Sequence, residues 1–125
     1  MDVLAVKDSD RQQPIPTAWR PVFCAIVAAF AKGDYLLGEG IREVTPLSPE
    51  CAAAIERSIV GYGARLDELP EATWNSSVCM WYGGYWDTLV DLWTLEEGAS
   101  DLTLCSRVTE QASRFSFAIT GVYVP

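Results

Sequence analysis

The residues best suited to chemistry in this chain are acids and aromatics gathered in one segment. Residues 66–106 hold eight carboxylates and no lysine or arginine, and four of the five tryptophans lie in the same segment. The acids are Asp67, Glu68, Glu71, Asp87, Asp91, Glu96, Glu97 and Asp101. The aromatic residues are Trp74, Trp81, Tyr82, Tyr85, Trp86 and Trp93. A field of one sign attracts partners of the opposite sign, and aromatic side chains anchor protein interfaces. The segment therefore predicts binding to a basic partner.

Several kinds of site are excluded by residue type. The chain contains no histidine, which excludes Ser-His-Asp and Cys-His nucleophiles and any histidine-ligated metal. The four cysteines are scattered, without the clustered spacing that zinc and redox sites require. They are Cys24, Cys51, Cys79 and Cys105. We expect them to be small buried apolar residues, although an even count leaves one disulfide open. The sequence predicts no metal site, no cofactor and no catalytic residue, and leaves carboxylate or tyrosine acid–base chemistry as the one route to catalysis.

Length, composition and charge limit the class of protein. A chain of 125 residues, 50% apolar and 21% charged, is expected to fold as one domain. Its net charge of −8 argues against nucleic acid or an anionic membrane as partner, because both bind through lysine and arginine. No apolar run reaches the ~20 residues of a membrane span, and the first residues lack a signal-peptide pattern. We therefore expect a cytoplasmic location.

The first half of the chain predicts an arm and two helices. Residues 1–16 are polar with two prolines and are predicted to form a flexible N-terminal arm, followed by a single domain over 17–125. Apolar residues at helical spacing predict a buried helix over 21–32, with Gly33 ending it. Ser48-Pro49-Glu50 has the residue types of a helix start. The second helix is predicted to run to about Val60, where Gly61 and Gly63 end it.

From Arg65 the pattern changes to the alternation of strands. The predicted strands are 65–69, 74–82, 85–94, 101–109 and 114–124, with turns at Gly83-Gly84 and at residues 96–100. Two helices followed by an antiparallel meander predict an α+β fold, with two main helices packed on one face of a four- to five-stranded antiparallel sheet.

Alternation also assigns the two faces of the strand 85–94. One face carries Trp86, Thr88, Val90 and Leu92. The other carries Tyr85, Asp87, Leu89, Asp91 and Trp93. Burying two unpaired carboxylates is costly, so the first face is predicted to meet the helices. Arg107, on the outer face of the next strand, is expected near Asp87 or Asp91. A solvated face with an ordinary cross-strand ion pair is the simplest structural reading of these acids.

Parts of the chain resemble a family of small uncharacterised bacterial proteins. The segments that carry this resemblance are Pro21-Val22-Phe23, Ala29-Phe30-Ala31-Lys32-Gly33-Asp34-Tyr35, Leu69-Pro70-Glu71-Ala72-Thr73-Trp74, Trp86-Asp87-Thr88-Leu89-Val90-Asp91-Leu92-Trp93 and Val122-Tyr123-Val124-Pro125. In size, acidity and lack of catalytic groups the chain also resembles the immunity proteins of bacterial toxin systems, such as contact-dependent growth inhibition. That resemblance implies a cytoplasmic, non-enzymatic toxin inhibitor that binds the C-terminal domain of a cognate toxin, often a basic nuclease. Neither resemblance assigns a role to a particular residue.

Two hypotheses of function follow, with a plain oligomerising structural protein as a third possibility. The first is an immunity protein that binds and neutralises a basic toxin domain. Its predicted contact residues are Asp67, Glu68, Glu71, Tyr85, Asp87, Asp91, Trp93, Glu96, Glu97 and Asp101. The second is a small enzyme of cone-like α+β fold, because residues 30–35 resemble the first helix end of nuclear-transport-factor-like folds, which host enzymes and binding modules alike. Its acid–base candidates are Asp87, Asp91 and Tyr85, and it requires a concave site.

Overall fold

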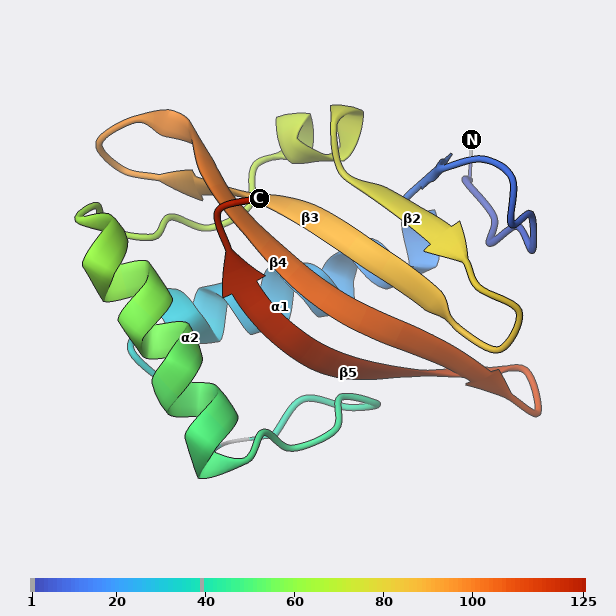
Figure 1. The fold of residues 1–125 in the computed structure, drawn as a ribbon, viewed down its shortest axis with the longest axis horizontal. Helices are drawn as coiled ribbons and strands as arrows, with labels where there is room; N and C mark the ends of the chain where they lie inside the picture. The colour runs from blue at the N-terminus through green and yellow to red at the C-terminus, as the bar shows by residue number, and fades with distance from the viewer. Residues whose placement is uncertain (1, 39) are drawn as a thin grey trace.

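The computed structural model of the protein describes residues 2–38 and 40–125. Within them the chain forms two α-helices and a five-stranded antiparallel sheet with strand order β1-β2-β3-β4-β5 (Figure 1). The helices are α1 (Arg20–Ala31) and α2 (Pro49–Tyr62), and short 3-10 helices span Thr17–Trp19 and Glu71–Asn75. The strands are β1 (Gln13–Pro14), β2 (Val78–Trp81), β3 (Trp86–Thr94), β4 (Gly98–Gln111) and β5 (Arg114–Tyr123). The predicted α+β fold class is confirmed.

The ends of both helices follow from local chemistry. The Ser48 hydroxyl accepts a hydrogen bond from the Cys51 backbone N–H at 3.1 Å, which satisfies one of the donors left free in the first turn of α2. α1 and α2 are followed by Gly33 and Gly63 with φ of 86° and 89°, a backbone conformation that glycine adopts without steric cost. Gly61, predicted to end the second helix, lies inside α2. Neither helix in the described part of the chain is long and apolar enough to cross a membrane.

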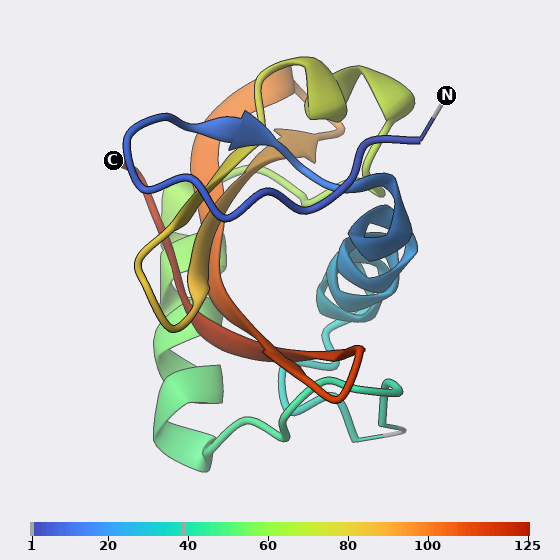
Figure 2. The same ribbon diagram turned by 90° about the vertical axis from the view of Figure 1, so that its right-hand side faces the viewer.

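Both helices and the inner face of the sheet, the face turned toward α1, share one hydrophobic core. The sheet curves around α1 (Figure 2). α1 contributes Phe23, Ile26, Val27 and Phe30. α2 lies beside β5 and adds Ile55 and Ile59. At the edge of β5, the Thr45 N–H donates to the Phe117 carbonyl and the Phe117 N–H donates to the Glu43 carbonyl. These bonds cover backbone groups that an edge strand would otherwise expose.

The N-terminal segment packs against the sheet. β1 pairs with β2, with Gln13 opposite Cys79, and Ile15 is completely buried in the core. Further upstream, the Trp86 indole N–H donates to the Val6 carbonyl at 3.0 Å. The Lys7 ammonium lies 5.2 Å from the centre of the Trp81 ring. The packed part of the chain therefore begins before residue 17, inside the segment predicted as an arm.

Three of the predicted strands differ from the structure by more than one residue. The strand predicted over 65–69 is wrong, because the segment makes only an isolated bridge between Leu66 and Thr94. The strand predicted over 74–82 is correct only for residues 78–81. Its first part belongs to the 3-10 helix that starts after Pro70. Directly after this helix, the Ser76 and Ser77 N–H groups both donate to the Thr73 carbonyl. β4 begins at Gly98 rather than 101, because a tight turn with Gly98 at φ 77° joins it to β3.

Candidate functional site

The outer face of the sheet, turned away from α1, carries some of the side chains predicted to bind a partner. Along β3, the inner residues Trp86, Thr88, Val90 and Leu92 are buried. The outer residues Asp87, Asp91 and Trp93 are half-buried, and Leu89 between the two aspartates is 39% exposed. The assignment of faces from alternation is confirmed. The strand therefore presents carboxylate, aliphatic, carboxylate and indole side chains in a row.

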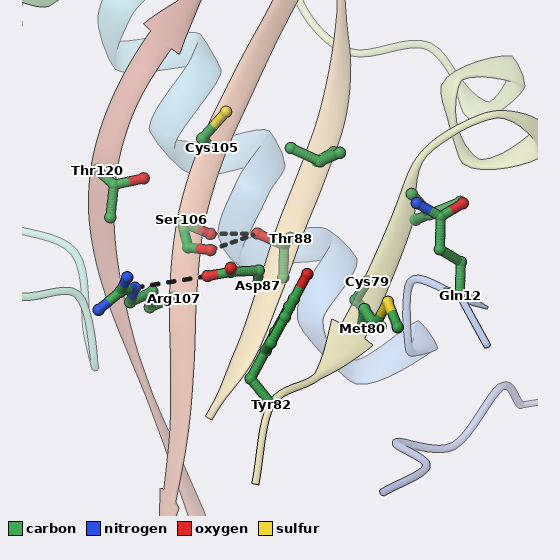
Figure 3. A pocket seen from close by; sticks show the side chains of 12 residues that line it. Gln12, Cys79, Met80, Tyr82, Asp87, Thr88, Cys105, Ser106, Arg107 and Thr120 are labelled. Carbon is green, nitrogen blue, oxygen red and sulfur yellow. Dashed lines mark hydrogen bonds and ion pairs between the residues drawn. The ribbon is translucent and has the colours of Figure 1, made fainter. Parts of the chain in front are cut away.

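One end of this face is electrically balanced. Asp87 pairs with Arg107 in the β3–β4 register, and Arg107 Nε lies 3.5 Å from Asp87 Oδ1 (Figure 3). The same guanidinium lies 4.5 Å from the centre of the Tyr85 ring. This confirms the predicted position of Arg107. The pair borders a pocket of about 340 Å³, which we call the Asp87 pocket. Its lining also includes Val78, Met80, Tyr82, Leu89, Cys105 and Thr120.

The other end of the face forms an acidic pocket of about 510 Å³. Its lining residues are Ser76, Asp91, Trp93, Ala99, Ser100, Asp101, Thr103, Val124 and Pro125. Among the described residues, this lining has two side-chain carboxylates and no lysine or arginine. A break in register creates this pocket: Asp91 pairs with Thr103, whereas Trp93 pairs with Ala99. Such a bulge redirects side chains and bends a strand. It places Asp101 beside Asp91 and Trp93 in one pocket.

Hydrogen bonds hold the acidic pocket in shape. The Ser76 hydroxyl donates to Asp91 Oδ2, and the Thr73 hydroxyl donates to the Asp91 carbonyl. On the opposite side, the Ser100 hydroxyl donates to the Leu92 carbonyl at 2.7 Å. The 3-10 helix Glu71–Asn75 and the bulge of β4 therefore fix the two walls. A site held in this way can bind a cation with little rearrangement.

Comparison with known proteins identifies the family. The model of DUF7668, a domain of unknown function, matches residues 27–125. The chain belongs to this family. No curated protein and no solved structure is significantly similar to the chain. The match runs from within α1 to the end of β5 and includes every residue of the acidic pocket. The pocket is therefore part of the DUF7668 domain, whereas β1 and the segment before it lie outside the match.

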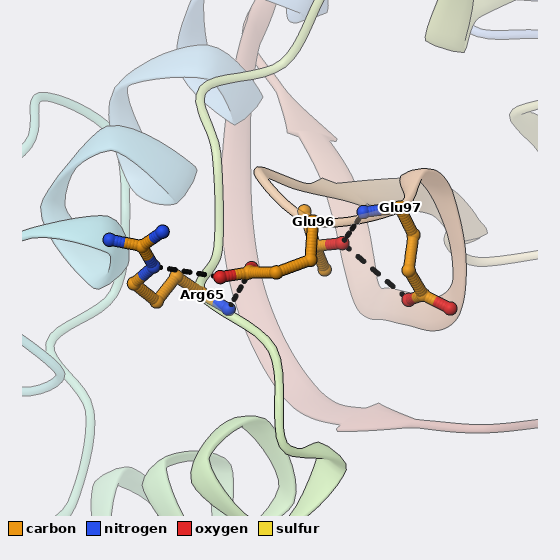
Figure 4. Close-up of polar contacts among 4 residues, drawn as sticks. Arg65, Glu96 and Glu97 are labelled. Carbon is orange, nitrogen blue, oxygen red and sulfur yellow. Dashed lines mark hydrogen bonds and ion pairs between the residues drawn. The ribbon is translucent and has the colours of Figure 1, made fainter.

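The turn between β3 and β4 of the DUF7668 domain holds two further predicted residues. Arg65 donates two hydrogen bonds to the Glu96 carboxylate (Figure 4). The Arg65 side-chain Nε lies 2.8 Å from Oε2, and the Arg65 backbone N lies 2.7 Å from Oε1. These bonds from Arg65 hold the pKa of the Glu96 carboxyl below its usual value. Glu97 instead contacts Thr94, whose hydroxyl accepts from the Glu97 N–H at 3.0 Å. Glu96 therefore ties the turn to the segment after α2 and is already paired.

The Arg65–Glu96 contact predicts a pH-dependent contribution to stability. Because the pKa of Glu96 is lower in the folded state, the carboxylate stabilises the fold above its ordinary pKa near 4.5 and loses this contribution as the pH falls below it. Glu96→Gln should therefore lower the urea midpoint at pH 7, and the difference from the wild type should shrink through that acid range. Glu97→Gln is the matched control, since the Glu97 carboxylate accepts from the Thr94 hydroxyl and, among the described residues, not from a basic side chain. A difference independent of pH would contradict this assignment.

The remaining predicted acids do not join the outer face. The Asp67 side chain makes a local hydrogen bond, in which its Oδ1 accepts from the Glu68 backbone N–H. Glu71 and Glu68 lie close enough to Cys24 of α1 to add to the rise in its thiol pKa that burial causes. These three acids therefore lie in the segment between α2 and β2, where Glu71 begins the 3-10 helix. The structure brings together only part of the predicted surface. Asp91, Trp93 and Asp101 share the acidic pocket, and Tyr85 and Asp87 meet at Arg107.

In the folded protein, basic side chains from outside residues 66–106 contact this acidic segment. In the part of the chain that the structure describes, at least four of the nine basic residues contact the acidic segment. Arg65 and Arg107 pair with Glu96 and Asp87. The Arg20 guanidinium lies 5.4 Å from the centre of the Trp74 ring, and Lys7 lies over Trp81. These basic side chains interrupt the predicted field of one sign, and the acidic pocket is the part of the outer face whose carboxylates have no basic partner among the described residues of the lining.

The four cysteines are free thiols, so the disulfide that their even number left open does not form in this structure. Cys79 is buried, and burial raises the pKa of its thiol to about 11. Burial also raises the pKa values of Cys24 and Cys105, with smaller contributions from nearby carboxylates. A thiol with a raised pKa is a poor nucleophile at neutral pH. Cys24, Cys51 and Cys105 are only half-buried, so full burial was predicted correctly only for Cys79.

Two contributors to the outer face were missed in the sequence. Leu89 is apolar and exposed between two aspartates, and the alternation of β3 already placed it on the outer side without giving it a role. Ser76, which directly follows the 3-10 helix Glu71–Asn75, orients Asp91. No local pattern indicates that contact, because it depends on where the segment before β2 folds. On the outer face, Asp91 and Asp101 can pair with a cation, Trp93 can stack on a planar group, and Leu89 can cover an aliphatic side chain.

Proposed function

We propose that this DUF7668 protein is a non-enzymatic immunity protein of the cytoplasm, which binds and neutralises the basic domain of a cognate toxin. The contact surface is the outer face of the sheet. The observation that carries the proposal is the acidic pocket, where two aspartates and an indole face outward with no basic residue in the lining. Carboxylates placed in this way attract a basic surface and speed its association. A nuclease that binds phosphates presents such a surface.

The packing of the inner face supports binding over catalysis. An enzyme of cone-like fold needs a concave site for its substrate. In this protein the concave side of the sheet is occupied by aromatic rings in edge-to-face contact. Trp19 lies 5.3 Å from Trp86 and 6.0 Å from Phe117, and Phe23 lies 5.6 Å from Phe117, between ring centres. The acids and aromatics left for function therefore lie on the outer face, which suits contact with a macromolecule.

The proposal predicts that a toxin gene lies beside this gene, and co-expression with the domain that it encodes tests it. Wild-type protein should restore growth of cells that produce the toxin domain, and Asp91→Lys with Asp101→Lys should abolish that protection. Glu50→Lys with Glu56→Lys changes the charge equally on exposed positions of α2 and should leave protection intact. Failure of the wild type to bind the toxin domain or protect against it would refute the proposed function.

A further inference from the structure

We infer that the outer face recognises two neighbouring side chains of its partner, an arginine in the acidic pocket and an aliphatic residue over Leu89. This inference rests on the proposed function, because it specifies what the basic partner presents to the same face. Its basis is the order of side chains along β3. Asp91 of the acidic pocket follows the exposed Leu89 by two residues on the same face, whereas the next carboxylate, Asp87, is already paired with Arg107.

The acidic pocket suits a guanidinium for three reasons. Asp91 is half-buried and held by Ser76 through Oδ2, so the carboxylate is oriented before a ligand arrives. Asp101 lines the same pocket, and the Trp93 side chain supplies an aromatic wall. A guanidinium is planar, forms paired hydrogen bonds with a carboxylate and stacks on an indole ring. A lysine ammonium offers a point charge without the planar fork.

The aliphatic position lies one strand repeat away. Leu89 is two residues before Asp91 on the same face, a distance of about 7 Å along a strand. Its cross-strand neighbours are Val78 on β2 and Cys105 on β4. With Met80, these residues line the Asp87 pocket of about 340 Å³. An aliphatic side chain placed there removes apolar surface from water on both partners.

The negative charge of the outer face favours a basic partner over a second copy of this chain. A second copy of this chain carries the same net charge of −8, and like charges brought together at an interface oppose association. A basic segment is complementary to Asp91 and Asp101. In an extended segment, residues two apart point to the same side and are spaced about 7 Å apart. The partner is therefore expected to carry an aliphatic residue two positions from an arginine on an exposed strand or extended loop.

A short peptide tests this inference without the toxin. The probe is acetyl-Leu-Gly-Arg-Gly-Leu-amide, which places a leucine two residues from the arginine in either direction of binding. In an NMR titration of the ¹⁵N-labelled full-length protein at low salt, it should shift the Trp93 indole signal and the amide signals of Leu89, Asp91 and Asp101. Citrulline in place of arginine keeps the shape without the charge and should weaken binding at least about tenfold, since a charge-assisted pair is lost. Alanine in place of both leucines should also weaken it.

Protein variants complete the test. Asp91→Asn and, separately, Asp101→Asn should each remove the preference for arginine over citrulline, whereas the loop control Asp67→Asn should retain it. The amide spectrum shows whether each variant is folded, and two independent variants keep the test decisive if one is not. Equal affinity for the arginine and citrulline peptides, or shifts centred on α1 or α2, would overturn the inference. Protection against the toxin without an arginine preference would overturn only this inference. An arginine preference without toxin binding would refute only the proposed function.

Discussion

Replacing Trp86 by alanine is expected to lower the free energy of unfolding by about 3–5 kcal/mol. Trp86 is 1% exposed, and its ring centre lies 5.3 Å from that of Trp19 and 4.5 Å from that of Trp81. Its indole N–H also donates to the Val6 carbonyl. The substitution therefore leaves a large cavity, removes edge-to-face contacts and releases the N-terminal segment. Native domains are stable by only about 5–15 kcal/mol, so the variant should be close to unfolding.

Urea denaturation followed by circular dichroism measures this loss. The matched control is Leu89→Ala, on the outer face of the same strand, where the side chain is exposed. Its effect should stay below about 1 kcal/mol, because little apolar surface is uncovered. Similar losses for Trp86→Ala and Leu89→Ala would contradict the assignment of inner and outer faces.

The second large effect concerns the acidic pocket. Asp91→Lys combined with Asp101→Lys is expected to weaken binding to the basic toxin domain by about a hundredfold or more, because two attractive contacts become repulsive. Most of the change at exposed Asp101 should appear in the association rate and its salt dependence. Trp93→Ala should act differently. It should speed dissociation and cost about 2 kcal/mol if the indole is an anchor.

Surface plasmon resonance at two salt concentrations separates these effects. Glu50→Lys with Glu56→Lys on α2 has the same change in net charge and controls for long-range attraction alone. If the two double variants lose affinity equally, net charge is responsible and the acidic pocket is not. Asp87→Lys is informative as well, because Asp87 already pairs with Arg107. Its effect should be smaller than that of Asp91→Lys.

Local patterns predicted most of the fold. The spacing of Ser48, Pro49 and Glu50 located the start of α2, because capping depends on neighbours in sequence. Alternation located the two faces of β3, because side chains of a strand alternate and two carboxylates are costly to bury. It also placed Arg107 near Asp87 or Asp91 once an antiparallel hairpin was assumed, and the register of the structure selects Asp87. These inferences needed no knowledge of distant contacts.

The candidate site depended on contacts that local patterns do not encode. The bulge that brings Asp101 to Asp91 is a change in register between β3 and β4, and an alternating sequence does not indicate where it occurs. The Arg65–Glu96 pair joins residues 31 positions apart. The contact between the Lys7 ammonium and the Trp81 ring depends on the packing of the N-terminal segment against the sheet. For this reason the prediction from sequence overestimated the extent of the acidic contact surface and did not identify the acidic pocket within it.

An NMR titration of the ¹⁵N-labelled protein with the cognate toxin domain tests the central claim most directly, because it locates the interface residue by residue. The predicted result is that the largest changes fall on the Trp93 indole signal and on the amides of Leu89, Asp91 and Asp101. Signals from the exposed sides of α1 and α2 should remain nearly unchanged. Changes concentrated on α1, α2 or the N-terminal segment, with the outer face of the sheet unaffected, would contradict the claim that this face binds the partner.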